Sequence, residues 1–346
     1  MLTKGSAVRV EAPCRADLAG GTLDIWPLGL LHAGALTVNA AVPVTVGMEV
    51  DLEGPNGEVW HAVGEGEWRR LSAADAATDL SAAVGFGLRP AGGARVRVLS
   101  QAPVGSGLGG SSAYAVALAR GLLAASGEEM EEVRLVAVLR DLEATVLSTP
   151  TGVQDHWAAV KGGALALHME PGTPRVERLA VDPDWLGERM TVFFTGITHH
   201  SGMVNWQVIR RRLEGEGRTA AALDGIAAAA ASCRNALLEA DEGGVAGAVA
   251  AEWVARKRLA PEVCPSELED LERVALDAGA LAVKACGAGG GGSLLLWHPP
   301  REQESLAAAL QAAAPAGRVL ATGVATEGCK VFLAGDSDAS GKAGGQ

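Results

Sequence analysis

Residues 103–113 constrain the fold most, because they place four glycines between a strand-forming run and a helix-forming run. They read Pro-Val-Gly-Ser-Gly-Leu-Gly-Gly-Ser-Ser-Ala. Glycines at this density let the backbone approach a ligand, so that successive N–H groups point at one anion. Ser111 or Ser112 is expected to cap a helix that begins near Ala113, whose N-terminus adds free N–H donors and a partial positive charge. The order strand, glycine-rich turn, helix predicts a phosphate-binding loop.

Two common phosphate loops fit this stretch poorly. A P-loop continues with lysine after its last glycine, and Ser111 stands there instead. Gly105, Gly107 and Gly110 satisfy the dinucleotide pattern G-x-G-x-x-G, which also needs an acidic residue about twenty positions on, at the end of a second strand. Residues 128–147 occupy that position, and their apolar residues recur with helical spacing. The P-loop is therefore excluded, and a nicotinamide dehydrogenase stays as a third alternative.

The composition is that of a globular protein that works on small molecules. A length of 346 residues suggests two domains, and the formal net charge of −12 argues against a surface for nucleic acid or anionic membrane. Five scattered cysteines without C-x-x-C spacing indicate neither a disulfide framework nor a zinc site. Residues 1–15 lack a continuous apolar segment, and no run of about eighteen apolar residues occurs. We therefore expect a cytoplasmic protein without a membrane partner.

Periodicity and turn residues divide the chain into segments. Strands are expected at 7–12, 35–50, 58–63, 94–99, 162–168, 190–194, 281–285, 293–297, 319–324 and 329–333, with 58–63 returning as a hairpin strand after a turn. Helices are expected at 69–87, 113–125, 128–147, 153–160, 203–214, 220–240, 245–259, 265–278 and 302–314. This pattern predicts a first domain at residues 1–170, a second at 171–334 that includes the last four strands, and a mobile tail at 335–346.

Charged residues gather around a glycine pair soon after the first strand. Arg15, Asp17 and Asp24 surround Gly20 and Gly21. These residues form either a solvated loop with an internal Arg–Asp pair or a charged binding site, and their spacing alone leaves both alternatives open.

A second glycine-rich stretch begins at Lys284 and reads Lys-Ala-Cys-Gly-Ala-Gly-Gly-Gly-Gly. So many glycines in an apolar context cost conformational entropy on folding, and close approach of two backbones is the expected compensation. A tight β-turn packed on a neighbour is the alternative.

The chain resembles the GHMP kinases, the family of galactokinase, homoserine kinase, mevalonate kinase and phosphomevalonate kinase, over residues 8–333. Residues 103–113 are similar to its second motif, P-x-x-x-G-L-x-S-S-A, with Gly110 in place of the first serine. Residues 12–24 resemble the first motif, and their Leu-Ala-Gly-Gly-Thr-Leu-Asp is closer to the heptose-7-phosphate kinase and fucokinase branches than to the galactokinases. The stretch from Lys284 matches the third motif, K-x-x-G-A-G-x-G-G.

This resemblance implies an α+β protein with the two-domain GHMP kinase fold. Its N-terminal domain would be like ribosomal protein S5 domain 2, its C-terminal domain ferredoxin-like, and ATP and the acceptor would lie between them. The implied reaction is transfer of the γ-phosphoryl group of ATP to a hydroxyl of a sugar or sugar phosphate, as in heptose-7-phosphate kinases and sugar-1-kinases. A mevalonate or phosphomevalonate type of kinase, or a nucleotide-binding regulatory protein without turnover, are the alternatives. A monomer or a homodimer is expected.

The resemblance also implies roles for single residues. Taken alone, Glu143 and Asp155 are ordinary helix carboxylates, but phosphoryl transfer needs oxygen ligands for Mg2+ and benefits from a base. Asp155 would be that base, Arg15 would offset charge on the transferring group, and Ser111 with Glu143 would hold Mg2+. ATP would contact Pro103, Gly105, Ser106, Gly107, Leu108, Gly109, Gly110, Ser111 and Ser112. The acceptor would contact Asp17, Gly20, Gly21, Thr22, Asp24, Gly287, Ala288, Gly289 and Gly290.

Two further features carry less chemistry. His199 and His200 have no Glu or Cys at metal-ligand spacing, so a substrate-lining loop is favoured over a metal site. Arg210, Arg211 and Arg212 are expected to form a solvated helix face. Ser112 remains an alternative to Ser111 as metal ligand, because Gly110 changes the usual spelling of the motif.

Overall fold

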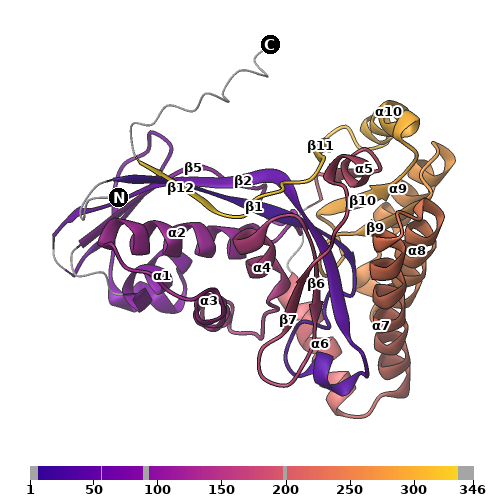
Figure 1. The fold of residues 1–346 in the computed structure, drawn as a ribbon, viewed down its shortest axis with the longest axis horizontal. Helices are drawn as coiled ribbons and strands as arrows, with labels where there is room; N and C mark the ends of the chain where they lie inside the picture. The colour runs from indigo at the N-terminus through magenta and orange to yellow at the C-terminus, as the bar shows by residue number, and fades with distance from the viewer. Residues whose placement is uncertain (1–6, 56, 89–92, 198–200, 334–346) are drawn as a thin grey trace.

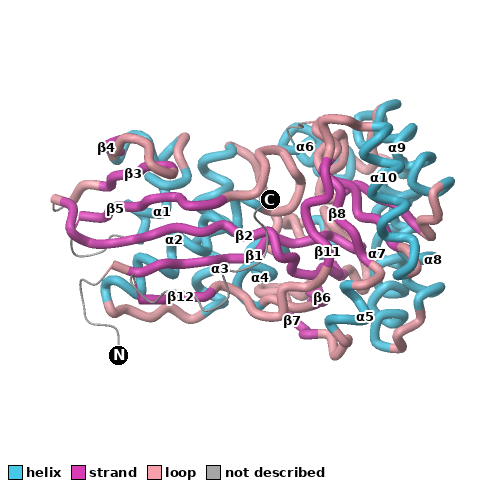
Figure 2. Tube along the Cα trace, turned by 90° about the horizontal axis from the view of Figure 1, so that it is seen from above, coloured by secondary structure: helices cyan, strands magenta, loops and turns pink. Residues whose placement is uncertain are grey.

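A computed structural model describes residues 7–55, 57–88, 93–197 and 201–333 of the chain. The described residues form a long sheet with helices on one face and a smaller sheet covered by long helices (Figure 1). Seen from above, the strands of the long sheet extend toward the smaller one (Figure 2). The fold is α+β, as the sequence predicted.

The long sheet is built on two strands that pair along most of their length. β1 (Val8–Ala19) and β2 (Leu36–Gly54) are antiparallel, with a register shift between Pro13 and Cys14. The sheet has the order β12 (Lys330–Leu333), β1, β2, β5 (Gly93–Ser100), β3 (Val59–Val63) and β4 (Arg69–Leu71), and β6 (Ala164–His168) pairs with β2 and with β7 (Arg175–Arg178).

Helices cover one face of this sheet (Figure 1). They are α1 (Leu80–Leu88), α2 (Gly110–Ser126), α3 (Glu132–Leu147) and α4 (Gln154–Lys161), and α3 packs on the other helices of this layer. α2 is rich in alanine and packs closely on the sheet: a Cβ at Gly121 would lie 2.7 Å from a methyl carbon of Val50. Small side chains therefore let α2 approach the sheet that positions its N-terminus.

The smaller sheet is antiparallel throughout, in the order β11 (Arg318–Thr322), β8 (Met190–Phe194), β10 (Ser293–Trp297) and β9 (Ala282–Ala285). The helices of this half are α5 (Pro183–Gly187), α6 (Ser201–Leu213), α7 (Gly217–Leu238), α8 (Glu242–Lys257), α9 (Ser266–Asp277) and α10 (Gln303–Ala313). Single 3-10 turns occur at η1 (Leu28–Leu31), η2 (Ala73–Ala77), η3 (Pro261–Val263) and η4 (Pro300–Glu302).

Several predicted elements differ from the structure. The first strand does not end at Pro13: the register shift there accommodates a residue without an N–H, and β1 continues to Ala19. β3 is not a hairpin partner of β2, since it runs parallel to β5 and antiparallel to β4. The segment predicted as one helix at 69–87 is β4, η2 and α1. These errors arise because strand partners and helix starts depend on contacts distant in sequence.

The last strand returns to the first domain. β12 pairs with β1, from Val8 opposite Leu333 to Glu11 opposite Lys330, so its assignment to the strands of the second domain was wrong. The sequence also missed β7 and α5, which are short and have no clear periodicity. The N- and C-terminal ends of the described chain are thus joined in one sheet.

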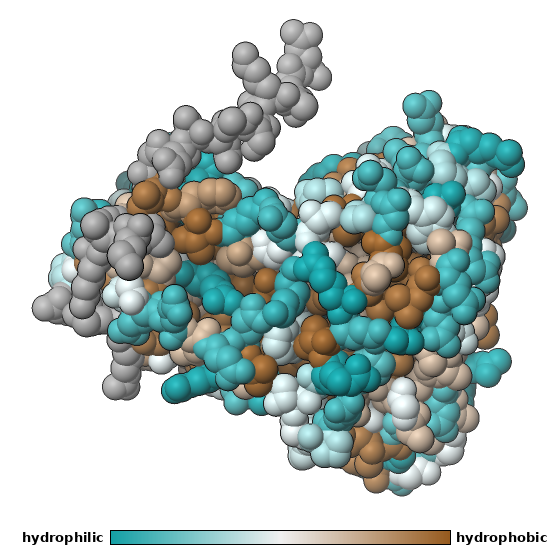
Figure 3. Space-filling model, in the orientation of Figure 1, coloured by the Kyte–Doolittle hydropathy of each residue, from teal (hydrophilic) through white to brown (hydrophobic). Residues whose placement is uncertain are grey.

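None of the helices within the described ranges is both long and apolar enough to cross a membrane. The face in Figure 3 shows polar side chains spread over both halves of the molecule, with apolar ones between them.

Candidate active site

A cleft of about 1250 Å³ opens between the two halves of the molecule. Its walls come from segments far apart in the sequence, and the structure brings together parts of all three glycine-containing motifs. The lining segments include residues 21–22, 24–25, 101–107, 109–111, 146–150, 154–155, 205–206 and 287–288.

The loop between β5 and α2 has the backbone of an anion cradle. Gly105, Gly107 and Gly109 have φ angles of +73°, +74° and +72°, a left-handed conformation that other residues rarely adopt. α2 begins at Gly110, with Gly109 as its N-cap and no described side chain bonded to its first N–H groups. The predicted serine cap is therefore wrong, because the helix starts earlier than expected. Its first N–H groups remain available to an anion.

The third motif supports this cradle from behind. Ser293 N donates a hydrogen bond to Ser106 O at 2.9 Å. A Cβ at Gly107 would lie only 2.5 Å from Cys286 O, and one at Gly292 only 2.8 Å from Gly105 O. Two glycine-rich backbones thus touch directly, which is the close approach that the sequence predicted for this stretch.

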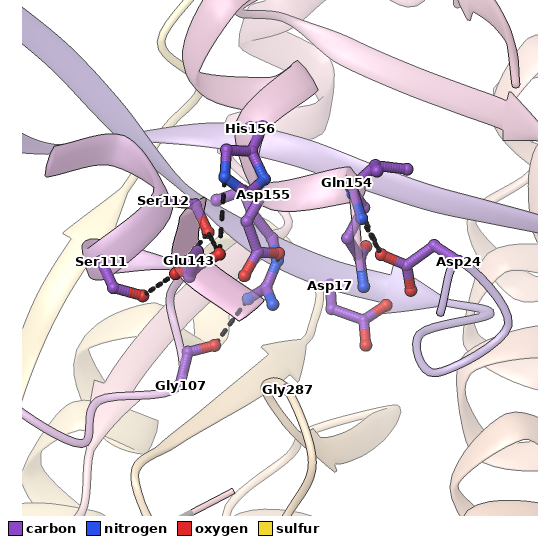
Figure 4. A network of polar contacts seen from close by, with 12 residues as sticks. Asp17, Asp24, Gly107, Ser111, Ser112, Glu143, Gln154, Asp155, His156 and Gly287 are labelled. Atoms are coloured by element: carbon purple, nitrogen blue, oxygen red, sulfur yellow. Dashed lines mark hydrogen bonds and ion pairs between the residues drawn. The ribbon is translucent and has the colours of Figure 1, made fainter. Parts of the chain in front are cut away.

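Ser111 and Ser112 lie in the first turn of α2, where both bond to one carboxylate (Figure 4). Ser111 Oγ donates to Glu143 Oε1 at 2.5 Å, and Ser112 Oγ donates to Glu143 Oε2 at 2.9 Å. Ser111 is exposed and lines the cleft, whereas Ser112 and Glu143 are buried. Behind them the buried His156 places Nε2 at 3.4 Å from Glu143 Oε2.

Arg15 joins the cradle to the predicted base. Its Nη1 donates to Gly107 O at 2.5 Å and its Nε to Asp155 Oδ1 at 2.7 Å, while its backbone N donates to Leu108 O at 3.0 Å. Burial lowers the pKa of Arg15, but the carboxylates of Asp155 and Asp17 raise it on balance above its usual value. The guanidinium is therefore a fixed positive charge, and Asp155 is oriented by it at the wall of the cleft.

Asp24 faces the same cleft from the turn after β1. Its Oδ2 accepts a hydrogen bond from Gln154 N at 3.0 Å (Figure 4) and another from Val153 N at 2.8 Å. Gly152 is required beside it, since a Cβ there would lie 1.9 Å from the same oxygen. Burial raises the pKa of Asp24 to about 6, and the charge of Asp155 adds to this rise.

Most of the predicted site residues line the cleft. They are Arg15, Gly21, Thr22, Asp24, Pro103, Gly105, Ser106, Gly107, Gly109, Gly110, Ser111, Asp155, Gly287 and Ala288. The remaining ones lie behind the wall: Asp17, Gly20, Leu108, Ser112, Glu143, Gly289 and Gly290.

The residues behind the wall have structural contacts of their own. Asp17 is fully buried, and its Oδ2 lies 3.1 Å from Lys284 Nζ. It does not face the cleft, which differs from its predicted contact with the acceptor. A Cβ at Gly20 would lie 2.2 Å from Leu36 O, and Gly290 N donates to Val263 O at 2.7 Å. The three motifs therefore contain residues that line the cleft and residues that pack behind it.

Two family models match separate parts of the chain. The GHMP kinases N terminal domain matches residues 72–163, and the GHMP kinases C terminal model matches residues 235–316. Together they cover about half of the chain. The chain belongs to the GHMP kinases. The resemblance seen in the motifs is thereby confirmed.

Two characterised relatives are similar in sequence to this GHMP kinase. The bifunctional fucokinase/GDP-fucose pyrophosphorylase of Arabidopsis thaliana is 28% identical over 292 residues, which is 76% of this chain and 27% of the relative. The D-glycero-alpha-D-manno-heptose 7-phosphate kinase of Campylobacter jejuni is 27% identical over 198 residues, which is 55% of this chain and 57% of the relative. The chain therefore spans less than two thirds of either relative.

Solved structures confirm the two-domain GHMP kinase fold. A D-glycero-D-manno-heptose 1-phosphate kinase from Bacteroides thetaiotaomicron has a TM-score of 0.73 at 22% identity, covering 94% of this chain and 99% of that one. The Lactococcus lactis galactokinase complexed with galactose has a TM-score of 0.77 at 14% identity, covering 94% of this chain and 95% of that one.

The sequence missed several residues of this GHMP kinase site. His156 follows Asp155 directly, but nothing in the sequence indicates that it is buried against Glu143. Asn205 and Trp206 line the cleft from α6, where they look like ordinary helix residues. His199 and His200 lie outside the described residues.

The arginine run on α6 is not simply a solvated face. Arg210 pairs with Glu214 on its own helix, as a solvated residue would, but Arg211 donates to Leu259 O at 3.1 Å and Arg212 to Leu31 O at 3.2 Å. Two of the three side chains therefore tie α6 to neighbouring segments, which the sequence prediction had wrong.

Proposed function

We propose that this protein is an ATP-dependent kinase that transfers the γ-phosphoryl group of ATP to a hydroxyl of a sugar or sugar phosphate. The observation that carries the proposal is a pair of hydrogen bonds donated by the Arg15 guanidinium, one to Gly107 O in the cradle and one to the Asp155 carboxylate. It places a cation and a carboxylate beside a backbone anion site in one cleft, which is the set of groups that phosphoryl transfer uses.

In this proposal Asp155 takes the proton from the acceptor hydroxyl. Its side chain is 25% exposed, so a hydroxyl in the cleft can reach it, and its bond to Arg15 Nε keeps one oxygen fixed while the other remains available. Arg15 is only 4% exposed and cannot swing away from the cradle. It stabilises negative charge on the transferring group as that charge moves from ATP toward the acceptor.

The cradle would bind the triphosphate through the N–H groups of residues 105 and 107–111, since Ser106 N already donates to Pro103 O. Ser111 Oγ and Glu143 Oε1 are hard oxygen donors that lie side by side at the edge of the cradle, joined by a hydrogen bond of 2.5 Å, and these two groups would be ligands of Mg2+. When bound, Mg2+ would neutralise charge on the phosphates. From the buried side, Ser112 Oγ donates to the other Glu143 oxygen at 2.9 Å, and His156 Nε2 lies 3.4 Å from it.

Asp24 would hold the acceptor. Its Oδ2 is engaged by two backbone N–H groups, so the carboxylate is fixed in the cleft wall and can accept hydrogen bonds from sugar hydroxyls. A fucokinase and a heptose 7-phosphate kinase among the relatives support a sugar or sugar phosphate over a branched acid.

A coupled assay of ADP release tests this function directly. Free hexoses, heptose phosphates and mevalonate are supplied separately with ATP and Mg2+. We expect ADP release that depends on a sugar or sugar phosphate and stops when Mg2+ is chelated. Turnover with mevalonate alone would replace the proposal with the mevalonate type of kinase. ATP binding without ADP release for any acceptor would instead favour a regulatory protein.

A further inference from the structure

Four charged side chains form a sealed cluster behind the side of the cleft that Asp24 and Gly287 line. This side, where the acceptor is proposed to bind, is called the acceptor side below. The sealed cluster consists of Asp17 on β1, Glu252 and Arg256 on α8, and Lys284 on β9, and each is at most 1% exposed. Two cations balance two anions, so the cluster is close to neutral. Burying four charges costs desolvation energy, and hydrogen bonds and ion pairs must offset it.

Arg256 connects this cluster to two loops of the cleft. Its Nη2 donates to Gly21 O at 2.7 Å, and its Nη1 donates to Thr22 Oγ1 at 3.1 Å and to Gly287 O at 3.4 Å. Gly21 and Thr22 belong to the turn that carries Asp24, whereas Gly287 belongs to the third motif. One guanidinium therefore spans both borders of the acceptor side.

The guanidinium is itself held in a fixed orientation. Glu252 Oε1 accepts from its Nε at 2.9 Å and also from its Nη2. Lys284 Nζ secures the rest of the cluster, at 3.0 Å from Asp17 O, 3.1 Å from Asp17 Oδ2 and 3.4 Å from Glu252 Oε2. A planar fork with fixed donors can set the positions of its acceptors, which a flexible ammonium group cannot.

The turn that Arg256 holds is strained. Thr22 has a φ of +79°, a backbone conformation that is rare for a β-branched residue. Such a conformation persists only where its surroundings determine it. The bonds from Arg256 to Gly21 O and Thr22 Oγ1 supply this restraint at the two residues that lead to Asp24.

We propose that Arg256 is a positioning residue for the phosphoryl acceptor: it fixes the turn at Gly21 and Thr22 against the loop at Gly287 and thereby sets the place of Asp24. Its effect on turnover rests on the kinase function proposed above. Arg256 does not line the cleft, so its action passes through these loops. A role in stability alone would weaken all activities equally, whereas a positioning role weakens the acceptor step.

Steady-state kinetics of two substitutions separates these roles. Arg256→Lys keeps the positive charge but loses the planar guanidinium, and Arg256→Gln loses both the charge and the guanidinium. Arg258, exposed at the end of the same helix, provides the matched controls Arg258→Lys and Arg258→Gln. We expect Arg256→Lys to lower kcat/KM for the acceptor by about 10²-fold, mainly through KM, because small displacements of bound groups are that costly. KM for ATP and both Arg258 controls stay near wild type. Equal changes in the two KM values, or none, would refute the positioning role.

Hydrogen exchange gives a test that needs no turnover. In folded Arg256→Lys, backbone amides of residues 21–25 and 286–288 should exchange faster than in wild type, while those of 105–111 keep their rates. Unchanged exchange in both loops would overturn the proposal. If the wild type releases no ADP with any acceptor, the kinase function fails, but this comparison of exchange rates still decides whether Arg256 holds the two loops.

Discussion

The cleft and the sealed cluster contain the same kinds of charged side chain, and β1 contributes to both, but the two places differ in how far these side chains are exposed to solvent. Arg15 and Asp17 are two residues apart, yet Arg15 bonds to Asp155 at the cleft wall, and Asp17 pairs with Lys284 inside the protein. Asp155 is 25% exposed, whereas no member of the sealed cluster exceeds 1%.

This difference in exposure distinguishes a carboxylate that is proposed to react from carboxylates that only hold the structure in place. A carboxylate that takes a proton needs access to a reactant, and the proposed base Asp155 has such access because its side chain is 25% exposed. A carboxylate without such access needs its charge cancelled: burial would raise the pKa of Asp17, but Lys284 and Arg256 hold it below its usual value. Substitutions in the cleft should therefore change rate, and those in the sealed cluster should change stability or geometry.

The largest expected effect is on the cleft side. Asp155→Asn removes the proposed base but preserves shape and the acceptor for Arg15 Nε, so kcat should fall by about 10²–10⁴-fold, the usual contribution of general-base catalysis. Coupled ADP-release assays measure this, with ATP affinity as the control that should change little. Full activity in this variant would mean that Asp155 is not the base.

On the sealed side, Lys284→Met leaves two buried carboxylates facing a single cation. We expect a loss of about 3–5 kcal/mol in the free energy of unfolding, the usual cost of removing one partner from a buried pair. Lys330→Met is the matched control, because Lys330 pairs with Glu327 at the surface, where about 1 kcal/mol or less is at stake. Urea unfolding measures both, and similar losses in the two variants would contradict the comparison.

Asp24 lies between the two cases, since it is buried yet belongs to the cleft. Its pKa of about 6 exceeds its ordinary 3.8, so between those pH values the unfolded chain ionises first and the wild type loses stability as pH rises. Asp24→Asn avoids this loss. From pH 4 to pH 7 its stability relative to wild type should rise by at most about 3 kcal/mol in urea unfolding. A pH-independent difference would mean that burial does not raise this pKa.

The smallest expected effect distinguishes the two serines on Glu143. Ser111→Ala removes the oxygen at the cleft and should lower activity at limiting Mg2+ by about 10–100-fold, as loss of metal-site partners does. Ser112→Ala removes a buried donor to Glu143 and should cost about 1–3 kcal/mol of stability instead. ADP-release rates titrated with Mg2+ and urea midpoints compare them. A larger Mg2+ effect in Ser112→Ala would make Ser112 the metal ligand.

The sequence determined the local parts of this protein. The glycines of residues 103–113 and 287–292 predicted turns and close backbone contact, because only glycine adopts these angles and distances without strain. Most helices and strands also followed from periodicity. The motif spellings led to the GHMP kinases, which the family models confirm.

Only the tertiary structure decided which charges meet. Asp17 and Asp24 lie in one motif, but their burial and partners depend on α8, β9 and the start of α4, more than a hundred residues away. The pairing of β12 with β1, the burial of His156 on Glu143 and the reach of Arg256 to Gly21 and Gly287 are likewise long-range contacts. Spacing along the chain fixes neither solvent access nor charge balance, because both are properties of the packed environment.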